Sequence, residues 1–346
     1  MARLAVSWDY GAGEVAMRSD RASGVAAVIA AVVVVFVSGC AGVQSPVGAM
    51  APPQGGARTP ALRGKVRARS SSHGDLLYIG SQEYGVFVLS YPQGQIVTQF
   101  EAPNDGVVFG MCSDQSGDVF VLTGGTPGYI YEYAHGGASP IATLQDGYDL
   151  PLACAVDPTT GNLAVVNNDV GTVAIFPDAQ DPPIYYNDPN MHKFDYCAYD
   201  DSGDLFVDGF KTGSGNIAML AELPYGSSSF TDITPSEKLG APGSMQWLGT
   251  YLAVGSSKQV VWHIEISGSS GMIVGKTNHK RLKNPWTIDG KQLISVYGNR
   301  EARSGPFKVA YWAYPKGGAP TQLFNLFGSN SSLDGVAVSL VSESRR

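Results

Sequence analysis

From residue 74 onward, the chain alternates short apolar runs with turns that contain glycine. Between residues 152 and 188, for example, the runs read LACAVD, NLAVVN, GTVAIF and PIYYND. Each run has the length of a β-strand and is rich in β-branched and aromatic residues, which pack well on a pleated surface. The pattern therefore predicts an all-β chain in which about 43 residues supply four strands.

This four-strand unit occurs six times. A glycine turn that leads into the second strand recurs at intervals of 41 to 46 residues, at Gly74, Gly117, Gly161, Gly203, Gly249 and Gly290. A second turn, usually containing Pro or Gly, follows the next strand in every copy. Repeats of about 40 to 50 residues with four strands are typical of propeller blades. We therefore predict a six-bladed β-propeller of four-stranded antiparallel blades over residues 74–341.

The two ends of the repeat region are complementary. The first unit lacks an inner strand, whereas the C-terminal run that begins at Gly335 has no unit after it. We expect this run to pair beside Leu77 and to complete the first blade, since closing the ring removes exposed strand edges. Residues 342–346 remain as a tail.

Four of the inner strands share a further pattern. The runs GMCSD, ACAVD, CAYD and GVAVS resemble the inner strand of NHL-type repeats. The resemblance covers roughly residues 74–341 and implies the architecture alone. NHL-like propellers include lactonases, lyases, ligand sensors and protein-binding scaffolds, so the fold does not select a function.

The beginning of the chain predicts export. Residues Val25 to Val37 form an uninterrupted apolar run, preceded by Arg18 and Arg21. The run is shorter than the ~20 residues that span a bilayer, but it suits the apolar region of a signal peptide. We assign residues 1–39 to a signal peptide, with Met17 as an alternative start.

The tetrad Val37-Ser38-Gly39-Cys40 resembles the lipobox of bacterial lipoproteins, which implies that Cys40 is lipidated. Residues 40–73 then form a lipidated cysteine and a disordered basic tether. Together with phrases such as CAVDPTTGNLAV and AYPKGGAPT, the lipobox makes the chain similar to a group of bacterial lipoproteins with no assigned activity. The resemblance implies a membrane-anchored protein of the cell envelope, periplasmic or at the cell surface.

The charge distribution narrows the range of partners. The formal net charge is −7, and residues 40–73 contain five basic side chains and no acidic one, so the chain from Gly74 onward carries −12. An acidic body argues against a nucleic-acid partner, because phosphate binding needs a basic surface. The basic tether is either a solvated linker or a segment that lies against anionic lipid. We expect a monomer.

Three cysteines lie in the inner strands of consecutive blades. Cys154 and Cys197 each precede an aspartate by three residues, whereas Cys112 precedes one by two residues. Cys112 should therefore lie on the other face of its strand. We also expect neighbouring inner strands to be farther apart than the ~7 Å that a disulfide allows between Cα atoms. Buried free thiols are therefore expected rather than a bridge.

The acidic turn at Asp200-Asp-Ser-Gly-Asp204 has two interpretations. Three carboxylates around a glycine could form a calcium loop. Equivalent turns at Asp114 and Asp157 belong to the same repeat, however, which favours a structural hairpin in which the aspartate accepts backbone amides.

The sequence contains no H-E-x-x-H motif, no G-x-S-x-G motif and no phosphate-binding glycine loop. Ligands of propellers usually bind where loops surround one mouth of the central channel. The candidate ligand-binding residues in these loops are Asp149, Asn190, His192, Asp195, Asp208, Arg300 and Arg303. The leading hypothesis is a non-enzymatic propeller without a cofactor that binds a glycan, a small molecule or an envelope protein.

Two alternatives remain open. The first is a metal-dependent lactonase or lyase, in which Asp149, Asp195 and Asp208 hold a divalent cation that polarises a carbonyl group. The second is a structural spacer without a small ligand, which predicts a blocked channel. The sequence selects neither a substrate nor a leaflet of the membrane.

Overall fold

The computed structural model describes residues 74–213, 215, 217–256, 258–297, 308–326 and 333–341. All of them belong to one compact unit of the chain. They form strands β1 to β24 and two short 3-10 helices, η1 (Pro103–Asp105) and η2 (Pro177–Ala179), and contain no α-helix. The predicted signal peptide and tether, including Cys40, lie outside the described residues.

Four sheets contain four antiparallel strands each. The first consists of β24 (Leu333–Ser339), β1 (Leu76–Ser81), β2 (Gly85–Ser90) and β3 (Ile96–Phe100). The second consists of β4 (Val107–Ser113), β5 (Val119–Gly124), β6 (Gly128–Tyr133) and β7 (Pro140–Asp146). The third consists of β8 (Pro151–Val156), β9 (Leu163–Asn167), β10 (Thr172–Phe176) and β11 (Ile184–Asn187). The fourth consists of β20 (Trp286–Asp289), β21 (Gln292–Tyr297), β22 (Lys308–Ala313) and β23 (Gln322–Asn325).

A fifth sheet contains eight strands in two antiparallel sets. One set consists of β12 (Met191–Tyr199), β13 (Leu205–Lys211), β14 (Ala218–Leu223) and β15 (Thr231–Pro235). The other consists of β16 (Met245–Trp247), β17 (Leu252–Ser256), β18 (Val260–Ser267) and β19 (Ser270–Asn278). A short parallel pairing of Thr234 and Pro235 with Ser270 and Gly271 joins β15 to β19.

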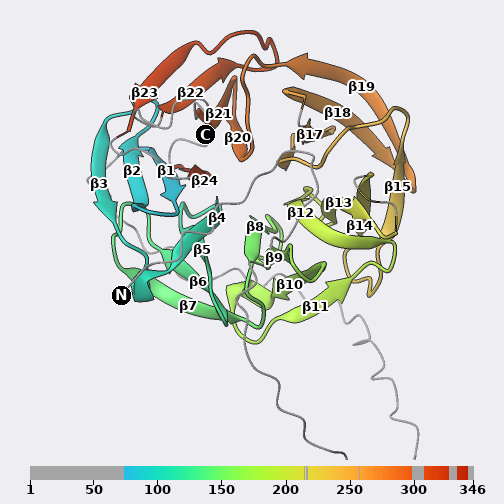
Figure 1. Cartoon of the computed structure of the whole chain (residues 1–346), viewed down its shortest axis with the longest axis horizontal. Helices are drawn as coiled ribbons and strands as arrows, with labels where there is room; N and C mark the ends of the chain where they lie inside the picture. The colour runs from blue at the N-terminus through green and yellow to red at the C-terminus, as the bar shows by residue number, and fades with distance from the viewer. Residues whose placement is uncertain are drawn as a thin grey trace, which may run out of the picture. The chain divides into compact units, whose positions relative to one another are not determined.

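The sheets are arranged around a common centre, as in a β-propeller (Figure 1). Strands β24, β4, β8 and β12 lie nearest the centre, and strands β3, β7, β11, β19 and β23 lie at the circumference. The fold is therefore all-β with a propeller arrangement of at least four four-stranded sheets.

Buried side chains fill the space between neighbouring sets of strands. Among the described residues they form six clusters, and each cluster joins two sets that follow one another in the chain or joins the last set to the first. In one of them, Leu77 and Ile79 of β1 pack with Ile294 of β21 and Tyr311 of β22. Neighbouring residues of a strand face opposite sides of its sheet, so each set of four strands contributes to two clusters.

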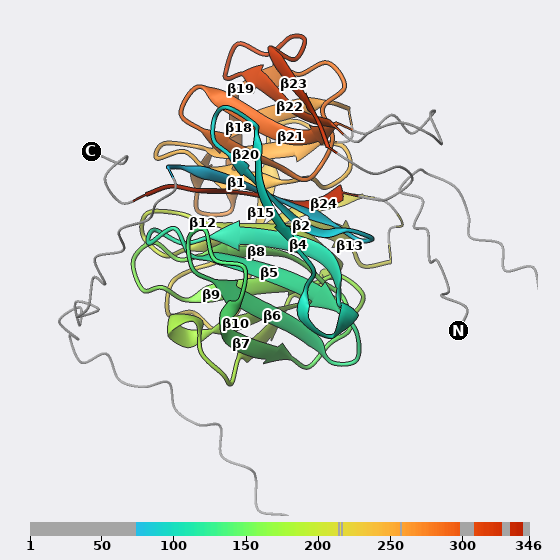
Figure 2. The same cartoon turned by 90° about the vertical axis from the view of Figure 1, so that its left-hand side faces the viewer.

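The C-terminal strand closes this arrangement, which confirms the predicted pairing. Val338 is the partner of Leu77, and Val336 is the partner of Ile79, in an antiparallel ladder between β24 and β1. Figure 2 shows the two strands side by side in one sheet. The first and last strands of the described region therefore share one set of hydrogen bonds.

The acidic turns are structural hairpins, as the repeat predicts. Asp114 Oδ1 accepts the amides of Ser116 and Asp118, and Asp200 Oδ1 accepts those of Ser202 and Asp204. The carboxylates satisfy amides that the tight turn would otherwise leave without acceptors.

The prediction of free thiols is wrong for two of the three cysteines. Cys112 of β4 and Cys154 of β8 form a disulfide with a Cα–Cα distance of 5.6 Å, whereas Cys197 is free and buried. Neighbouring sheets pack face to face, so a bridge between them needs one cysteine on each of the two opposed faces. The one-residue offset of Cys112, which argued against a bridge, provides this orientation. Both cysteines pack against the cluster that joins the β4–β7 and β8–β11 sheets.

Candidate functional site

The inner strands enclose a small central cavity. Its lining comes from β4, β8, β12, β16, β20 and β24 and the residues that adjoin them: Gly110, Met111, Leu152, Ala153, Cys154, Tyr196, Cys197, Ser244, Met245, Pro285, Trp286, Asp334, Gly335 and Val336. Segments from all six sets of strands therefore meet at one place.

This cavity has a volume of only about 70 Å³. The strands approach closely because glycines stand where side chains would collide. A Cβ atom on Gly110 would lie 2.2 Å from the carbonyl oxygen of Leu152, and one on Gly335 would lie 2.9 Å from the side chain of Met111. Small-molecule pockets usually measure about 300 Å³ or more, so the space suits a few water molecules rather than an organic ligand.

Four of the inner strands carry a β-bulge at the same place in the repeat. The residues skipped in the pairing register are Phe109, Leu152, Asp195 and Asp334. Bulges turn a side chain out of the regular alternation and are frequent at the rims of barrels and beside sites. In β12 and β24 the bulged residue is an aspartate, Asp195 or Asp334, so the bulge turns a carboxylate out of the regular alternation of the inner strand.

Asp195 lies in a buried cluster with two other polar side chains. It is 5% exposed, and its Oδ1 accepts a hydrogen bond of 2.7 Å from Asn168 Nδ2. Its Oδ2 has no hydrogen-bond partner among the described residues. The same Asn168 amide also donates to the carbonyl of Phe194, which fixes the amide beside the bulge.

Asp208 of β13 is the second carboxylate of this cluster. It is 2% exposed; its Oδ1 accepts the amide of Tyr196 at 3.0 Å, and its Oδ2 accepts the amide of Gly243 at 2.8 Å. Asp208 thus ties the bulge of β12 to the segment that precedes β16. Its two oxygens are occupied by backbone donors.

Burial disfavours the charged form of both carboxylates. It raises the pKa of Asp195 to about 6, against smaller opposing effects from the charge of Lys193 and the hydrogen bond from Asn168. Burial also raises the pKa of Asp208 well above its usual range, and the charge of Asp195 raises it further, although backbone amides oppose the shift. Asp195 therefore keeps its proton to a higher pH than an exposed aspartate does.

The other predicted site residues lie elsewhere. Asp149 is exposed in the connection before β8. Asn190 donates through its side chain to Asp232 at 2.9 Å, and the ring of His192 is exposed and contacts the carbonyl of Lys211 at 3.1 Å. Arg300 and Arg303 lie outside the described residues. The structure thus brings together Asp195 and Asp208 of the predicted set.

Two features of the site were missed. Asp334 lines the cavity, and its position in the repeat, five residues before Ser339, matches that of Asp195 before Asp200. An alignment of the C-terminal strand with the inner strands would have found it. The second feature, the pairing of Asp195 with Asn168, connects two different sheets and has no signal in the local sequence.

Neither a cluster of metal-ligating side chains nor a membrane-spanning helix is found among the described residues. No three His, Cys, Asp or Glu side chains among them are grouped closely enough to hold a metal ion. The described part of the chain also contains no helix with the length and apolar character that crossing a bilayer requires.

Comparison with known proteins supports the fold. No protein-family model and no curated protein matches the chain. A chain in a crystal structure of a nidogen/laminin complex is similar with a TM-score of 0.60 and 13% identity, over 78% of this chain and 99% of that one. A protein of unknown function from Bacteroides caccae has a TM-score of 0.54 and 12% identity, over 77% and 99% of the two chains. U3-55K has a TM-score of 0.51 and 12% identity, over 72% and 77%. At these identities the similarity shows the fold alone, which is a β-propeller.

Proposed function

We propose that this protein is an exported, lipid-anchored β-propeller with six blades, and that it acts in the cell envelope as a non-enzymatic binding or scaffold protein. The blade count is supported by the six sets of four strands and by the six clusters that join them in a ring. The eight-stranded sheet then represents two blades linked by the short β15–β19 pairing.

The observation that carries the proposal is the narrow centre of the ring. A cavity of about 70 Å³ between the inner strands is smaller than the ~300 Å³ of usual small-molecule pockets, so we place recognition on the outer surface of the loops. A structural spacer also predicts a narrow centre, and the crosslinking experiment below distinguishes the two. Such a surface suits a macromolecule, either an envelope protein or a glycan. The loops that precede the inner strands, including the one with Asp149, form the proposed binding face.

Export is supported by the disulfide as well as by the signal sequence. Disulfides persist in oxidising compartments and are rare in the cytosol, and Cys112 is bonded to Cys154. The lipobox ending at Cys40 supports attachment to the membrane, where two acyl chains on one residue would hold the protein stably.

A photo-crosslinking experiment in intact cells tests the binding face. A photoreactive amino acid at Asp149 is compared with one at Gln115, which is also exposed. Asp149 precedes an inner strand and Gln115 follows one, so the two positions lie at opposite ends of these strands. We expect a discrete adduct from position 149 and none from position 115. Equal labelling at both positions, or none at position 149, would contradict the proposed face.

The alternative is a metal-dependent lactonase or lyase that uses the Asp195–Asp208 pair. Both oxygens of Asp208 accept backbone amides, and a cation would have to displace these donors. A panel of lactones, esters and glycosides distinguishes the alternatives. Turnover that requires calcium or zinc and disappears in Asp195→Ala would replace the binding proposal.

A further inference from the structure

The charges of the propeller are strongly segregated along the chain. Residues 74–243, which form β1 to β15, contain 22 acidic and 3 basic side chains, a net charge of −19. The described residues between 244 and 326, which include β16 to β23, contain 8 basic and 2 acidic side chains, a net charge of +6. Because consecutive sets of strands occupy consecutive sectors, the sequence difference becomes a spatial one. The part formed by β16 to β23 is a basic sector in an otherwise acidic ring.

Three chain segments bring exposed lysines together in this sector. Lys258 lies in the turn between β17 and β18, and Lys280 follows the end of β19. Lys316 lies in the connection between β22 and β23. This connection is held at the end of β19, because the Gly318 amide donates to the Asn278 carbonyl and the Lys280 amide donates to the Gly318 carbonyl. The His279 amide also donates to the Gln259 carbonyl, so backbone hydrogen bonds connect the three segments that carry these lysines.

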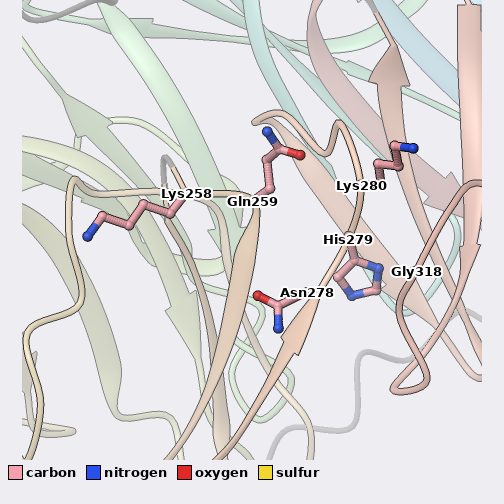
Figure 3. A pocket seen from close by; sticks show the side chains of 6 residues that line it. All are labelled: Lys258, Gln259, Asn278, His279, Lys280 and Gly318. Carbon is pink, nitrogen blue, oxygen red and sulfur yellow. The ribbon is translucent and has the colours of Figure 1, made fainter.

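A hollow of about 340 Å³ lies among these segments. Its lining consists of Lys258, Gln259, Asn278, His279, Lys280 and Gly318. In Figure 3, the side chains of Lys258 and Lys280 lie on either side of Asn278 and His279. His279 is fully buried and its ring packs against Trp312 and Tyr314. The hollow thus combines a rigid buried residue with two cations and two amide side chains that can donate hydrogen bonds to oxyanions.

Apolar side chains are exposed on the same strand. Met272 and Val274 of β19 are 60% and 49% exposed, and Lys276 follows them at the next alternate position. The parallel pairing of β19 with β15 covers Ser270 and Gly271 and ends before Met272. A bulge at Val274 interrupts the alternation of side chains along β19. Met272 is paired with Glu265 of β18, whereas Lys276 is paired with Trp262, and its ammonium group lies 5.0 Å from the centre of that ring. Met272 and Lys276 therefore lie on opposite sides of β19.

We propose that this basic sector is a docking surface for the anionic phospholipid headgroups of the membrane that carries the protein. The lysines around the hollow bind headgroup phosphates. The inference rests on the proposed lipid anchor, which keeps the propeller close to the bilayer through a tether that is itself basic. The acidic remainder of the ring is repelled by an anionic surface, so the docked orientation is defined by charge.

Vesicle binding by the full-length chain carrying Cys40→Ala tests this proposal without acylation. Vesicles of phosphatidylcholine alone are compared with vesicles that also contain one quarter phosphatidylglycerol, at low and high salt. We expect the chain to prefer the anionic vesicles, and Lys258→Glu/Lys280→Glu to weaken that binding at least tenfold. The matched control is Lys211→Glu/Lys238→Glu, which makes the same change of charge at exposed positions of the acidic part. We expect the control to bind within twofold of the parent chain.

Three results would overturn the proposal. One is equal binding to both kinds of vesicle, and another is an equal loss in the two double variants, since net charge alone would then explain the effect. The third is binding to heparin, used as a soluble anionic polysaccharide, without binding to anionic vesicles. Failure of the anchor is a separate outcome, seen as absence of fatty-acid labelling at Cys40 in cells. Circular dichroism and thermal unfolding confirm that each variant is folded.

Discussion

Removing the Cys112–Cys154 disulfide is expected to lower the free energy of unfolding by about 4 kcal/mol. The bridge joins residues separated by 42 positions, and closing a loop of that length reduces the conformational entropy of the unfolded chain by about this amount in the chain-entropy description. The loss is a large share of the 5–15 kcal/mol that typically stabilises a folded domain. Denaturant unfolding of Cys112→Ala/Cys154→Ala against the wild-type chain measures it.

Reduction and a third cysteine provide the controls. A thiol reductant should destabilise the wild-type chain and leave the double variant unchanged. Cys197→Ala, which removes the buried free thiol, should retain its sensitivity to the reductant. A wild-type protein whose unfolding does not respond to reduction would show that the bridge is absent or without effect.

The second large effect concerns the pH dependence of stability. Asp195 has an ordinary pKa of 3.8, which burial raises to about 6. The folded protein therefore binds more protons at this site than the unfolded chain between these two values. It follows that the contribution of Asp195 to the free energy of unfolding is greatest below pH 3.8 and is lost as pH rises to about 6. A shift of two units corresponds to about 3 kcal/mol.

Asp195→Asn removes this ionisation and should stabilise the protein above pH 7 by up to about 3 kcal/mol. The difference between variant and wild type should shrink towards zero near pH 4. Asp149→Asn, at an exposed position, is the control and should show no such trend. A difference that is constant with pH, or that grows as pH falls, would show that Asp195 is not a buried carboxyl group of raised pKa.

The regular part of the fold could be predicted because every copy of the unit carries the same local signals. The glycine turns mark the hairpins, as at Gly117 and Gly203, where φ is positive. That the C-terminal strand pairs with β1 could be predicted from the counting of strands alone. Repetition converts weak local patterns into a strong prediction of architecture, because one interpretation has to fit six places.

The predictions that were wrong or incomplete concern contacts between sheets. A disulfide between Cys112 and Cys154 requires knowledge of which faces oppose one another, whereas the sequence shows only the offset of each cysteine from its turn. The hydrogen bond between Asn168 and Asp195 likewise joins the β9–β10 connection to β12. Local periodicity places Asn168 and Asp195 near one end of their sheets. Their contact, however, depends on the bulge in β12, which sets the direction of the Asp195 side chain. Asn190 and His192, which the sequence places in the same candidate set as Asp195, contact Asp232 and Lys211 instead.

The positions of the loops and of the proposed faces depend on closure of the ring by β1 and β24. An engineered disulfide between these strands tests the closure directly. Leu77 and Val338 are paired residues of β1 and β24, and both face the same buried cluster. We expect Leu77→Cys/Val338→Cys to form a bridge under oxidising conditions, observed by mass spectrometry of proteolytic fragments. Tyr78→Cys/Val338→Cys, whose side chains face opposite sides of the sheet, should remain unbridged. Free thiols in the first variant, or bridging in both, would contradict the closed ring.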